Sequence, residues 1–429
     1  MSENWDKKTK LRVAVCGGGI AGLALASFLS KAEDITVDVY EAKSEVRTIG
    51  AGIAIWQCYW DLLKDAVGLE AKWCARGMPA PEWEQMKGPT LLRADDPANA
   101  HEFFQLDISP TVIPRTMLLE TLLEETNKRC TIHTEKRLVS YSTNDNGTVT
   151  LSFADGLTAT ADLLIGADGV HSQVRETMYR DTPELAQPVF SGQLAYRLKC
   201  RSESLPPDHR AHSRFLIWCG DGRFVTSNMV GDFVQMTAYD NVEVATDGKF
   251  CDDWVKQTPV DEVSQQYSGW DPELLSLLNA SSDASRWAIH TVRPLSRYAV
   301  GHVALVGDAA HAMTPHIGLG GGQGIHDAFI LSQLLMHSSI DRSTLGNALD
   351  VYDEIRRPAS QRIAQWSLEC GLMYGFLIPD KKDLPPDSLA KEFYMRTDWL
   401  RNKNVLDTEL ALAQNELRKS LQRGEKCQA

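Results

Sequence analysis

The sequence predicts an α/β protein that has a parallel sheet near the N-terminus, a second and mainly antiparallel sheet, and helices toward the C-terminus. Residues 11–16 form a β-branched apolar run that breaks into glycines and continues into the Ala- and Leu-rich segment 23–30. This order is typical of a buried parallel strand, a tight turn and a helix. Segments 192–199, 214–218 and 233–239 instead alternate apolar and polar residues, which indicates antiparallel strands with one buried face.

Length and composition limit the possible classes of protein. At 429 residues the chain exceeds what one hydrophobic core usually holds, so we expect two closely packed domains. The net charge of −13 argues against nucleic acid or an anionic membrane as a partner, because both attract clustered Lys and Arg. No apolar run reaches the ~18 residues of a membrane span. The nine cysteines contain no CxxC pair, so we expect reduced thiols in a cytoplasmic protein and no metal site. We also expect a monomer or a homodimer.

The first glycine cluster, Gly17-x-Gly19-x-x-Gly22, has the spacing of a Rossmann-like dinucleotide-binding turn. In that pattern Gly17 makes the turn, Gly19 lets the backbone approach a pyrophosphate, and Gly22 lets the helix pack against the strand. The helix N-terminus then directs free N–H groups toward the phosphates. Glu41 ends the next predicted strand, where the ribose hydroxyls of a dinucleotide need an acceptor.

Further elements follow along the chain. Pro114 precedes apolar residues at helical spacing, which places Arg115 in the first turn of a helix. Two more buried strand patterns, at 161–167 and 301–306, end in the pairs Asp168-Gly169 and Gly307-Asp308. The chain after residue 324 is predicted to be helical, with breaks at its late prolines.

These three clusters of glycines and acids, in this order, resemble the flavin-dependent aromatic monooxygenases of the para-hydroxybenzoate hydroxylase fold. Within that family the sequence is most similar to salicylate hydroxylases. The resemblance covers nearly the whole chain. It includes residues 164–175, 306–316, 318–324 and 356–362.

The resemblance implies a discontinuous FAD-binding domain (1–76, 108–186 and 290–375), a substrate domain (77–107 and 187–289) and a C-terminal helical segment (376–429). The residues expected to bind FAD are Gly17, Gly19, Ile20, Ala21, Gly22, Glu41, Arg47, Gly52, Arg115, Asp168, Asp308, Gly318, Gly320, Gly321 and Gly322.

Several of these residue types also suit a flavin on chemical grounds. The Asp308 carboxylate can accept hydrogen bonds from a ribityl chain; the alternative is a helix N-cap, and one side chain could do both. The glycines from 318 to 324 allow the backbone to lie against a flat ring. For Asp168 the alternative is a simple β-turn. For Arg115, which matches a pyrophosphate-binding arginine of the family, the alternative is a solvated surface charge.

The resemblance implies a reaction in two halves: NADH or NADPH reduces FAD, and O2 then forms a C4a-hydroperoxide that hydroxylates an electron-rich ring. The small aromatic substrate is expected to be a phenol, with salicylate or a hydroxybenzoate favoured and with decarboxylation left open. Candidate catalytic residues are His316, which would assist phenol deprotonation or hold a carboxylate, the adjacent Pro315, and Arg197 and Tyr239 from the antiparallel sheet.

One segment departs from the family pattern. Where a Pro-Asn pair is usual, this chain has Trp56 and, four residues later, Trp60, which would either wall the substrate cavity or pack beneath a helix. Other readings therefore stay open: a hydroxylase or epoxidase of a larger indole alkaloid or polyketide phenol, a flavoprotein dehydrogenase or oxidase, or a non-catalytic FAD-binding protein.

Overall fold

The parallel sheet predicted near the N-terminus is present. The structure, a computed structural model, describes residues 9–47, 52–244, 248–381 and 384–428. The sheet has six strands in the order β18-β19-β11-β1-β2-β7, all parallel except the edge pair β18–β19. Its strands are β1 (Leu11–Cys16), β2 (Ile35–Tyr40), β7 (Thr131–His133), β11 (Leu163–Gly166), β18 (Ala299–Val300) and β19 (Val303–Leu305).

Both faces of this sheet are covered, which explains why β1 and β11 are continuous apolar runs. Helices α1 (Ile20–Leu29), α4 (Arg115–Thr126) and α10 (Gly320–Leu335) pack against one another beside it. A three-stranded antiparallel sheet of β8 (Leu138–Thr143), β9 (Val149–Phe153) and β10 (Thr158–Ala161) contacts β1 and the helix α5 (Gln173–Met178).

The second sheet has eight strands in the order β16-β17-β12-β15-β14-β13-β4-β5. Every neighbouring pair is antiparallel except β13–β4, so the predicted mainly antiparallel sheet is confirmed. Its strands are β4 (Thr90–Arg93), β5 (His101–Gln105), β12 (Val189–Arg201), β13 (Leu216–Gly220), β14 (Arg223–Val230), β15 (Phe233–Asn241), β16 (Val255–Thr258) and β17 (Ala284–Thr291).

The remaining elements connect the two sheets or cover them. The two-stranded pair β3 (Gly52–Ile55) and β6 (Thr111–Pro114) leads into α4. The stretch from residue 57 to residue 75 forms two helices, because Gly68 adopts a left-handed φ of 68° between them. The other helices are α2 (Gln57–Val67), α3 (Leu69–Ala75), α6 (Pro183–Ala186), α7 (Val260–Gln266), α8 (Pro272–Asn279), α9 (Asp308–His311), α11 (Leu345–Tyr374), α12 (Pro386–Thr397) and α13 (Val405–Gln428).

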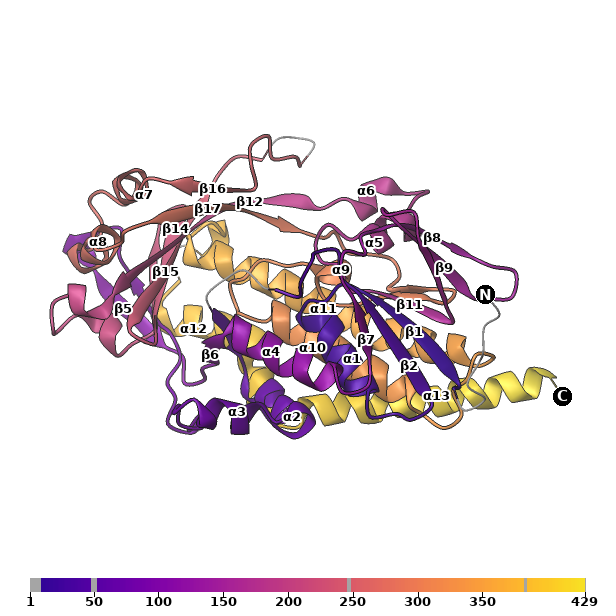
Figure 1. The fold of residues 1–429 in the computed structure, drawn as a ribbon. Helices are drawn as coiled ribbons and strands as arrows, with labels where there is room; N and C mark the ends of the chain where they lie inside the picture. The colour runs from indigo at the N-terminus through magenta and orange to yellow at the C-terminus, as the bar shows by residue number, and fades with distance from the viewer. Residues whose placement is uncertain (1–8, 48–51, 245–247, 382–383, 429) are drawn as a thin grey trace.

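Figure 1 shows the eight-stranded sheet toward the left and the parallel sheet toward the right. The long helix α11 packs against β18 of the parallel sheet and against β13 of the eight-stranded sheet, so it contacts both sheets. The strands of the larger sheet come from two stretches of chain, 90–105 and 189–291, with β6 to β11 inserted between them. The domain boundaries themselves stay a prediction. Within the described residues, no helix combines the length and apolar character of a membrane span.

Candidate active site

The turn between β1 and α1 shows different reasons for its three glycines. Gly17 has a φ of 111°, and a Cβ there would overlap the carbonyl of Ala167. A Cβ at Gly22 would overlap the carbonyl oxygen of Gly17, so close packing of helix on strand requires glycine. At Gly19, by contrast, a Cβ would meet no atom of the described residues within 4 Å. The fold itself therefore needs glycine at positions 17 and 22, while Gly19 faces open space beside the N-terminus of α1.

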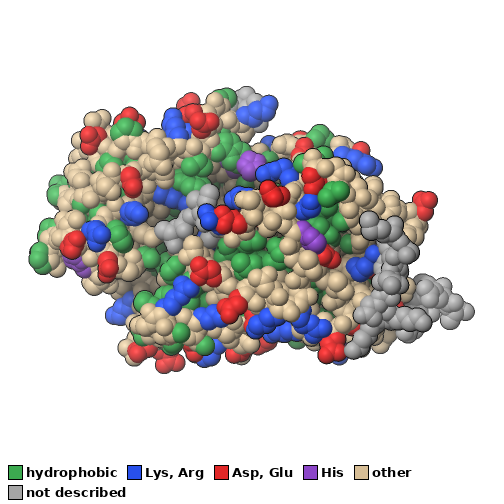
Figure 2. Space-filling view, viewed as in Figure 1, with side chains coloured by type: hydrophobic (Ala, Val, Ile, Leu, Met, Phe, Trp, Pro, Cys, Tyr) green, Lys and Arg blue, Asp and Glu red, His purple; other side chains and the backbone are tan. Residues whose placement is uncertain are grey.

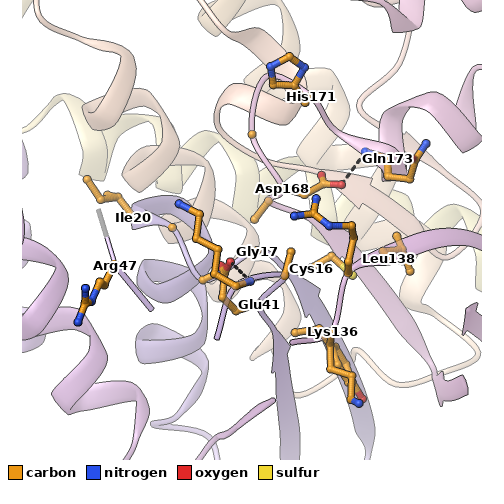
Figure 3. Close-up of a pocket in the computed structure, with 18 of the residues that line it drawn as sticks. Cys16, Gly17, Ile20, Glu41, Arg47, Lys136, Leu138, Asp168, His171 and Gln173 are labelled. Atoms are coloured by element: carbon orange, nitrogen blue, oxygen red, sulfur yellow. Dashed lines mark hydrogen bonds between the residues drawn. The ribbon is translucent and has the colours of Figure 1, made fainter. Parts of the chain in front are cut away.

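A cavity of about 520 Å³ lies over this turn. Glu41 reaches into it, and its carboxylate accepts hydrogen bonds from the N–H groups of Gly18 and Lys43, both at 2.9 Å. Figure 3 shows Glu41 close to the glycine turn, whereas Arg47 extends away from it. Arg47 is exposed and pairs with Glu45 at 2.5 Å, although it also lines the cavity.

Asp168 lines the same cavity, but its carboxylate is already engaged by the protein. It accepts hydrogen bonds from the backbone N–H groups of Gln173, at 2.7 Å, and Val174, at 3.1 Å, and from the hydroxyl of Ser172. Burial raises the pKa of Asp168, and these hydrogen bonds oppose that rise. Asp168 thus caps the N-terminus of α5, and Figure 3 shows its hydrogen bond to Gln173. Neither the expected FAD contact nor the β-turn alternative included this cap. A direct contact of Asp168 with FAD stays a prediction.

Asp308 behaves in the opposite way. It is the first residue of the short helix α9, after Gly307 with a φ of 60°, and its side chain is exposed. Within the described chain its carboxylate accepts no hydrogen bond, so it does not cap the helix. It lines none of the three cavities described here.

Arg115 stands between two cavities. It begins α4 and lines both the 520 Å³ cavity and a second one of about 390 Å³. Its Nε is buried and has no hydrogen-bond partner among the described residues. A buried cationic donor without a partner is costly, so this position favours an anionic ligand and excludes the solvated surface charge.

Arg197 also borders both of these cavities. It projects from β12, and its guanidinium lies 4.1 Å from the ring centre of Trp287. Partial burial lowers the pKa of Arg197. The neighbouring Tyr239 opposes this effect, and the positive charge of Arg115 adds to it. The side chain stays reachable by solvent because the cavity is open. Figure 2 shows this face hollowed between two lobes, with basic and acidic side chains mixed around the rim.

A third, smaller cavity of about 190 Å³ adjoins the second. The residues that line both are Gly52, Thr226, Asn228, Gln235, Tyr239 and Pro315. Among the described residues, no charged side chain lines the small cavity. His316 and Trp56 are among the other residues of its wall.

His316 is held tightly at the edge of this small cavity. Its Nε2 lies 2.6 Å from Oε1 of Gln193, and its ring stands edge-on to Tyr239 and Phe224, with centroids 5.0 and 5.2 Å away. Burial lowers the pKa of His316 to about 3, so the ring is neutral at physiological pH. A neutral ring cannot hold a carboxylate by charge. Burial likewise raises the pKa of Tyr239 to about 12.

Three comparisons place these features among known proteins. Residues 10–367 match the FAD binding domain family. The chain is 31% identical to a salicylate hydroxylase of Pseudomonas putida, with 96% of each chain covered, and 31% identical to 6-methylsalicylate 1-monooxygenase of Aspergillus terreus, with 86% and 84% covered. The solved salicylate hydroxylase substrate complex matches with a TM-score of 0.82 at 28% identity, covering 95% and 98% of the two chains.

The chain belongs to the FAD binding domain family. It is an FAD-dependent aromatic monooxygenase, so the prediction of the enzyme class and of the FAD cofactor is confirmed. The dehydrogenase, oxidase and non-catalytic alternatives are correspondingly set aside.

Trp56 and Trp60 of the monooxygenase divide between the two predicted roles, lining a cavity and packing beneath a helix. Trp56 lines the small cavity, and its indole N–H points to the carbonyl of Ile317 at 3.4 Å. Trp60 is fully buried, donates to Glu70 at 2.9 Å and packs edge-on against two other tryptophans. Only the first tryptophan therefore shapes the site.

The glycine cluster at the start of α10 has a second reason besides the one predicted. A Cβ at Gly321 would stand 2.6 Å from Ile53, and one at Gly322 would stand 2.5 Å from Tyr59. Gly318 has a φ of 63° and lies against Ala54, whereas Gly320 is crowded by nothing closer than 3.8 Å. Packing of α10 onto the buried ring of Tyr59 thus requires glycine at 322 even without a flavin, whereas at 321 a Cβ would meet only the end of the Ile53 side chain, which can shift.

A buried polar network behind the Gly307 turn was not predicted. Asp327 on α10 accepts hydrogen bonds from the N–H of Gly307 at 2.9 Å, from Nε of Arg356 at 2.9 Å, and pairs with His311 at 2.6 Å. Arg356 also binds Glu409 of α13 at 2.7 Å. His311 is therefore a structural member of the turn, and the network fixes where Asp308 stands. An acid and an arginine at helical positions carry no sequence signal for this role.

Proposed function

We propose that the monooxygenase hydroxylates a single-ring phenol of the salicylate class, using NADH or NADPH and O2. The observation that carries this proposal is the small cavity: about 190 Å³, without charged side chains, walled by Trp56 and bordered by the neutral ring of His316. The Pseudomonas and Aspergillus relatives, named for salicylate and 6-methylsalicylate, support the same class.

The residues present fit FAD. The open space at Gly19 suits a pyrophosphate at the N-terminus of α1, and the unpaired Nε of Arg115 suits its negative charge. Glu41 would accept the ribose hydroxyls, and Asp308 would accept from the ribityl chain. When bound, FAD supplies the acceptor for hydride and the means to activate O2.

Cavity size selects against the larger substrates considered above. A cavity of about 150 Å³ accommodates benzene, so about 190 Å³ suits one substituted ring. The adjoining second cavity is the space we assign to the flavin ring, which leaves no room there for a fused alkaloid or polyketide skeleton.

The polar lining then orients the ring. The side-chain amides of Asn228 and Gln235 would donate hydrogen bonds to a carboxylate, since the cavity holds no cation for it. Arg197 sits in the next cavity, stacked on Trp287, and would attract the anion from there. His316 would receive the phenolic hydroxyl, while the aromatic walls exclude water.

The test is substrate-stimulated NAD(P)H oxidation by the FAD-loaded protein, with salicylate, phenol, benzoate and 2-methoxybenzoate as a matched set. We expect salicylate to stimulate most, and the product to gain one oxygen atom from isotopically labelled O2. Release of CO2 with formation of a catechol would place the attack at the carboxylate-bearing carbon. The proposal fails if no single-ring phenol stimulates oxidation while a larger alkaloid or polyketide phenol does.

A further inference from the structure

A chain of hydrogen bonds runs from His316 away from the small cavity. Nε2 of His316 lies 2.6 Å from Oε1 of Gln193, Nε2 of Gln193 donates to Oδ1 of Asn241 at 3.0 Å, and Nδ2 of Asn241 donates to the carbonyl of Gly222 at 2.8 Å. The register of β12 and β15 places Gln193 directly opposite Asn241, which explains why the two amides meet.

The direction of every bond in this chain is fixed by its far end. The carbonyl of Gly222 can only accept, so Asn241 must turn its NH2 group toward it and its oxygen toward Gln193. Gln193 must then donate its NH2 group to Asn241 and present its oxygen to His316. A carbonyl oxygen accepts only, so the hydrogen of the neutral imidazole must be on Nε2.

The rest of the ring's surroundings leave Nδ1 as an unused acceptor. A Cβ on Gly371 would overlap the Cδ2–Nε2 edge of the ring, so that edge is covered by α11 as well as by Gln193. Nδ1 is buried and has no hydrogen-bond partner in the described structure. A buried acceptor without a partner costs free energy until a ligand donates to it.

We propose that Gln193 and Asn241 are positioning residues that hold His316 as the Nε2–H tautomer, so that Nδ1 accepts the O–H of a substrate bound as the neutral phenol. The inference rests on the proposed function for its ligand, but not for the state of the histidine. Gln193 and Asn241 line none of the cavities described above, so they act through His316.

Among the residues that the structure describes, none packed around the ring supplies a charge that would favour the imidazolium. Tyr239 on β15 and both Cys370 and Tyr374 on α11 have pKa values raised by burial and are neutral near pH 7. The Arg223–Asp240 ion pair projects from the opposite face of the sheet, because side chains alternate along strands. Arg197 shares the face of Gln193 on β12 and is positively charged, so it does not favour an imidazolium either.

The direct test is the tautomer of His316 in the FAD-loaded enzyme, read from long-range 1H–15N correlation spectra with His316→Asn to assign the signal. We expect the Nε2–H form with no titration between about pH 5 and about 9. An Nδ1–H form, or an imidazolium in that range, would overturn the inference without any bearing on the substrate.

The second test compares salicylate with 2-methoxybenzoate, which lacks the O–H, by the change in flavin absorbance on binding. The wild type should prefer salicylate by roughly 5- to 10-fold, the scale of one buried hydrogen bond. Gln193→Glu places a carboxylate against Nε2–H and favours the imidazolium, so the preference should fall toward 1 and become pH-dependent. Gln193→Met, whose thioether sulfur is only a weak acceptor, should also reduce the preference.

Gln235→Glu is the matched control, because it adds the same charge to the cavity wall without contacting His316. It should weaken both ligands and leave their ratio unchanged. A wild-type ratio and pH profile in both Gln193 variants, with FAD content unchanged, would refute the inference. Binding of neither ligand by the wild type would instead count against the proposed function.

Discussion

Replacing the glycines of the first turn one at a time separates folding from cofactor binding. Gly19→Val puts a side chain into space where no atom of the described chain lies within 4 Å of the new Cβ, and the backbone there, with a φ of −79°, is allowed for any residue. The fold should therefore lose no more than about 1 kcal/mol, the cost of a poorer N-cap. Gly17→Ala and Gly22→Ala place a Cβ against a backbone carbonyl, and each should destabilise the fold by about 1–3 kcal/mol.

The effect on FAD should be the reverse. A valine at position 19 displaces the pyrophosphate from the N-terminus of α1 and removes at least one charge-assisted hydrogen bond, which is worth about 1.5–3 kcal/mol. The affinity for FAD should fall by roughly 10- to 150-fold. Titration of apoprotein with FAD measures the affinity, and thermal unfolding of the same apoprotein measures the fold. If Gly19→Val binds FAD as tightly as the wild type, the pyrophosphate does not lie against that turn and the assignment is wrong.

Five further changes test other parts of the site and the network that supports it. Arg115→Met and Asp308→Ala should each lower FAD affinity by about 1–3 kcal/mol, measured by the same titration, and unchanged affinity would remove that residue from the cofactor site. His316→Ala should keep FAD but uncouple oxidation, so that H2O2 replaces hydroxylated product; full coupling would make it a loop residue. Trp56→Ala should enlarge the small cavity and admit bulkier phenols, measured as a shift in relative kcat/KM, whereas unchanged selectivity would place the limiting wall elsewhere. Arg356→Met leaves Asp327 buried without its cation and should cost about 3–5 kcal/mol in thermal unfolding, and a smaller loss would show that water or His311 compensates.

The parts of the fold that could be predicted are those written in short stretches of sequence. The strand, turn and helix from residue 11 to residue 29 follow from an apolar run and glycine spacing, and the mainly antiparallel sheet follows from alternation. Arg115 was placed correctly in the first turn of a helix. Its unpaired Nε could not be predicted, because it depends on burial between two cavities.

Other site features depend on long-range contacts that local patterns do not contain. Position 322 on α10 needs glycine because the ring of Tyr59, far away in sequence, lies against it. The carboxylate of Asp168 accepts hydrogen bonds from the first N–H groups of α5, a helix that the sequence motif did not predict. For His316 the sequence suggested a side chain that titrates near neutrality, yet burial lowers its pKa to about 3, and burial is a property of the fold.

The architecture divides the chemistry between two sets of elements. The parts that fit FAD lie at the ends of β1 and β2 and at the start of α4, whereas the small cavity draws on β3, β13, β14 and β15 and on the loop that carries His316. The larger sheet carries both the cavity amides Asn228 and Gln235 and the positioning residues Gln193 and Asn241. Substitutions on that sheet can therefore change which phenol is bound, and in which protonation state, while the FAD turn and its buried Arg356–Asp327 support stay unaltered.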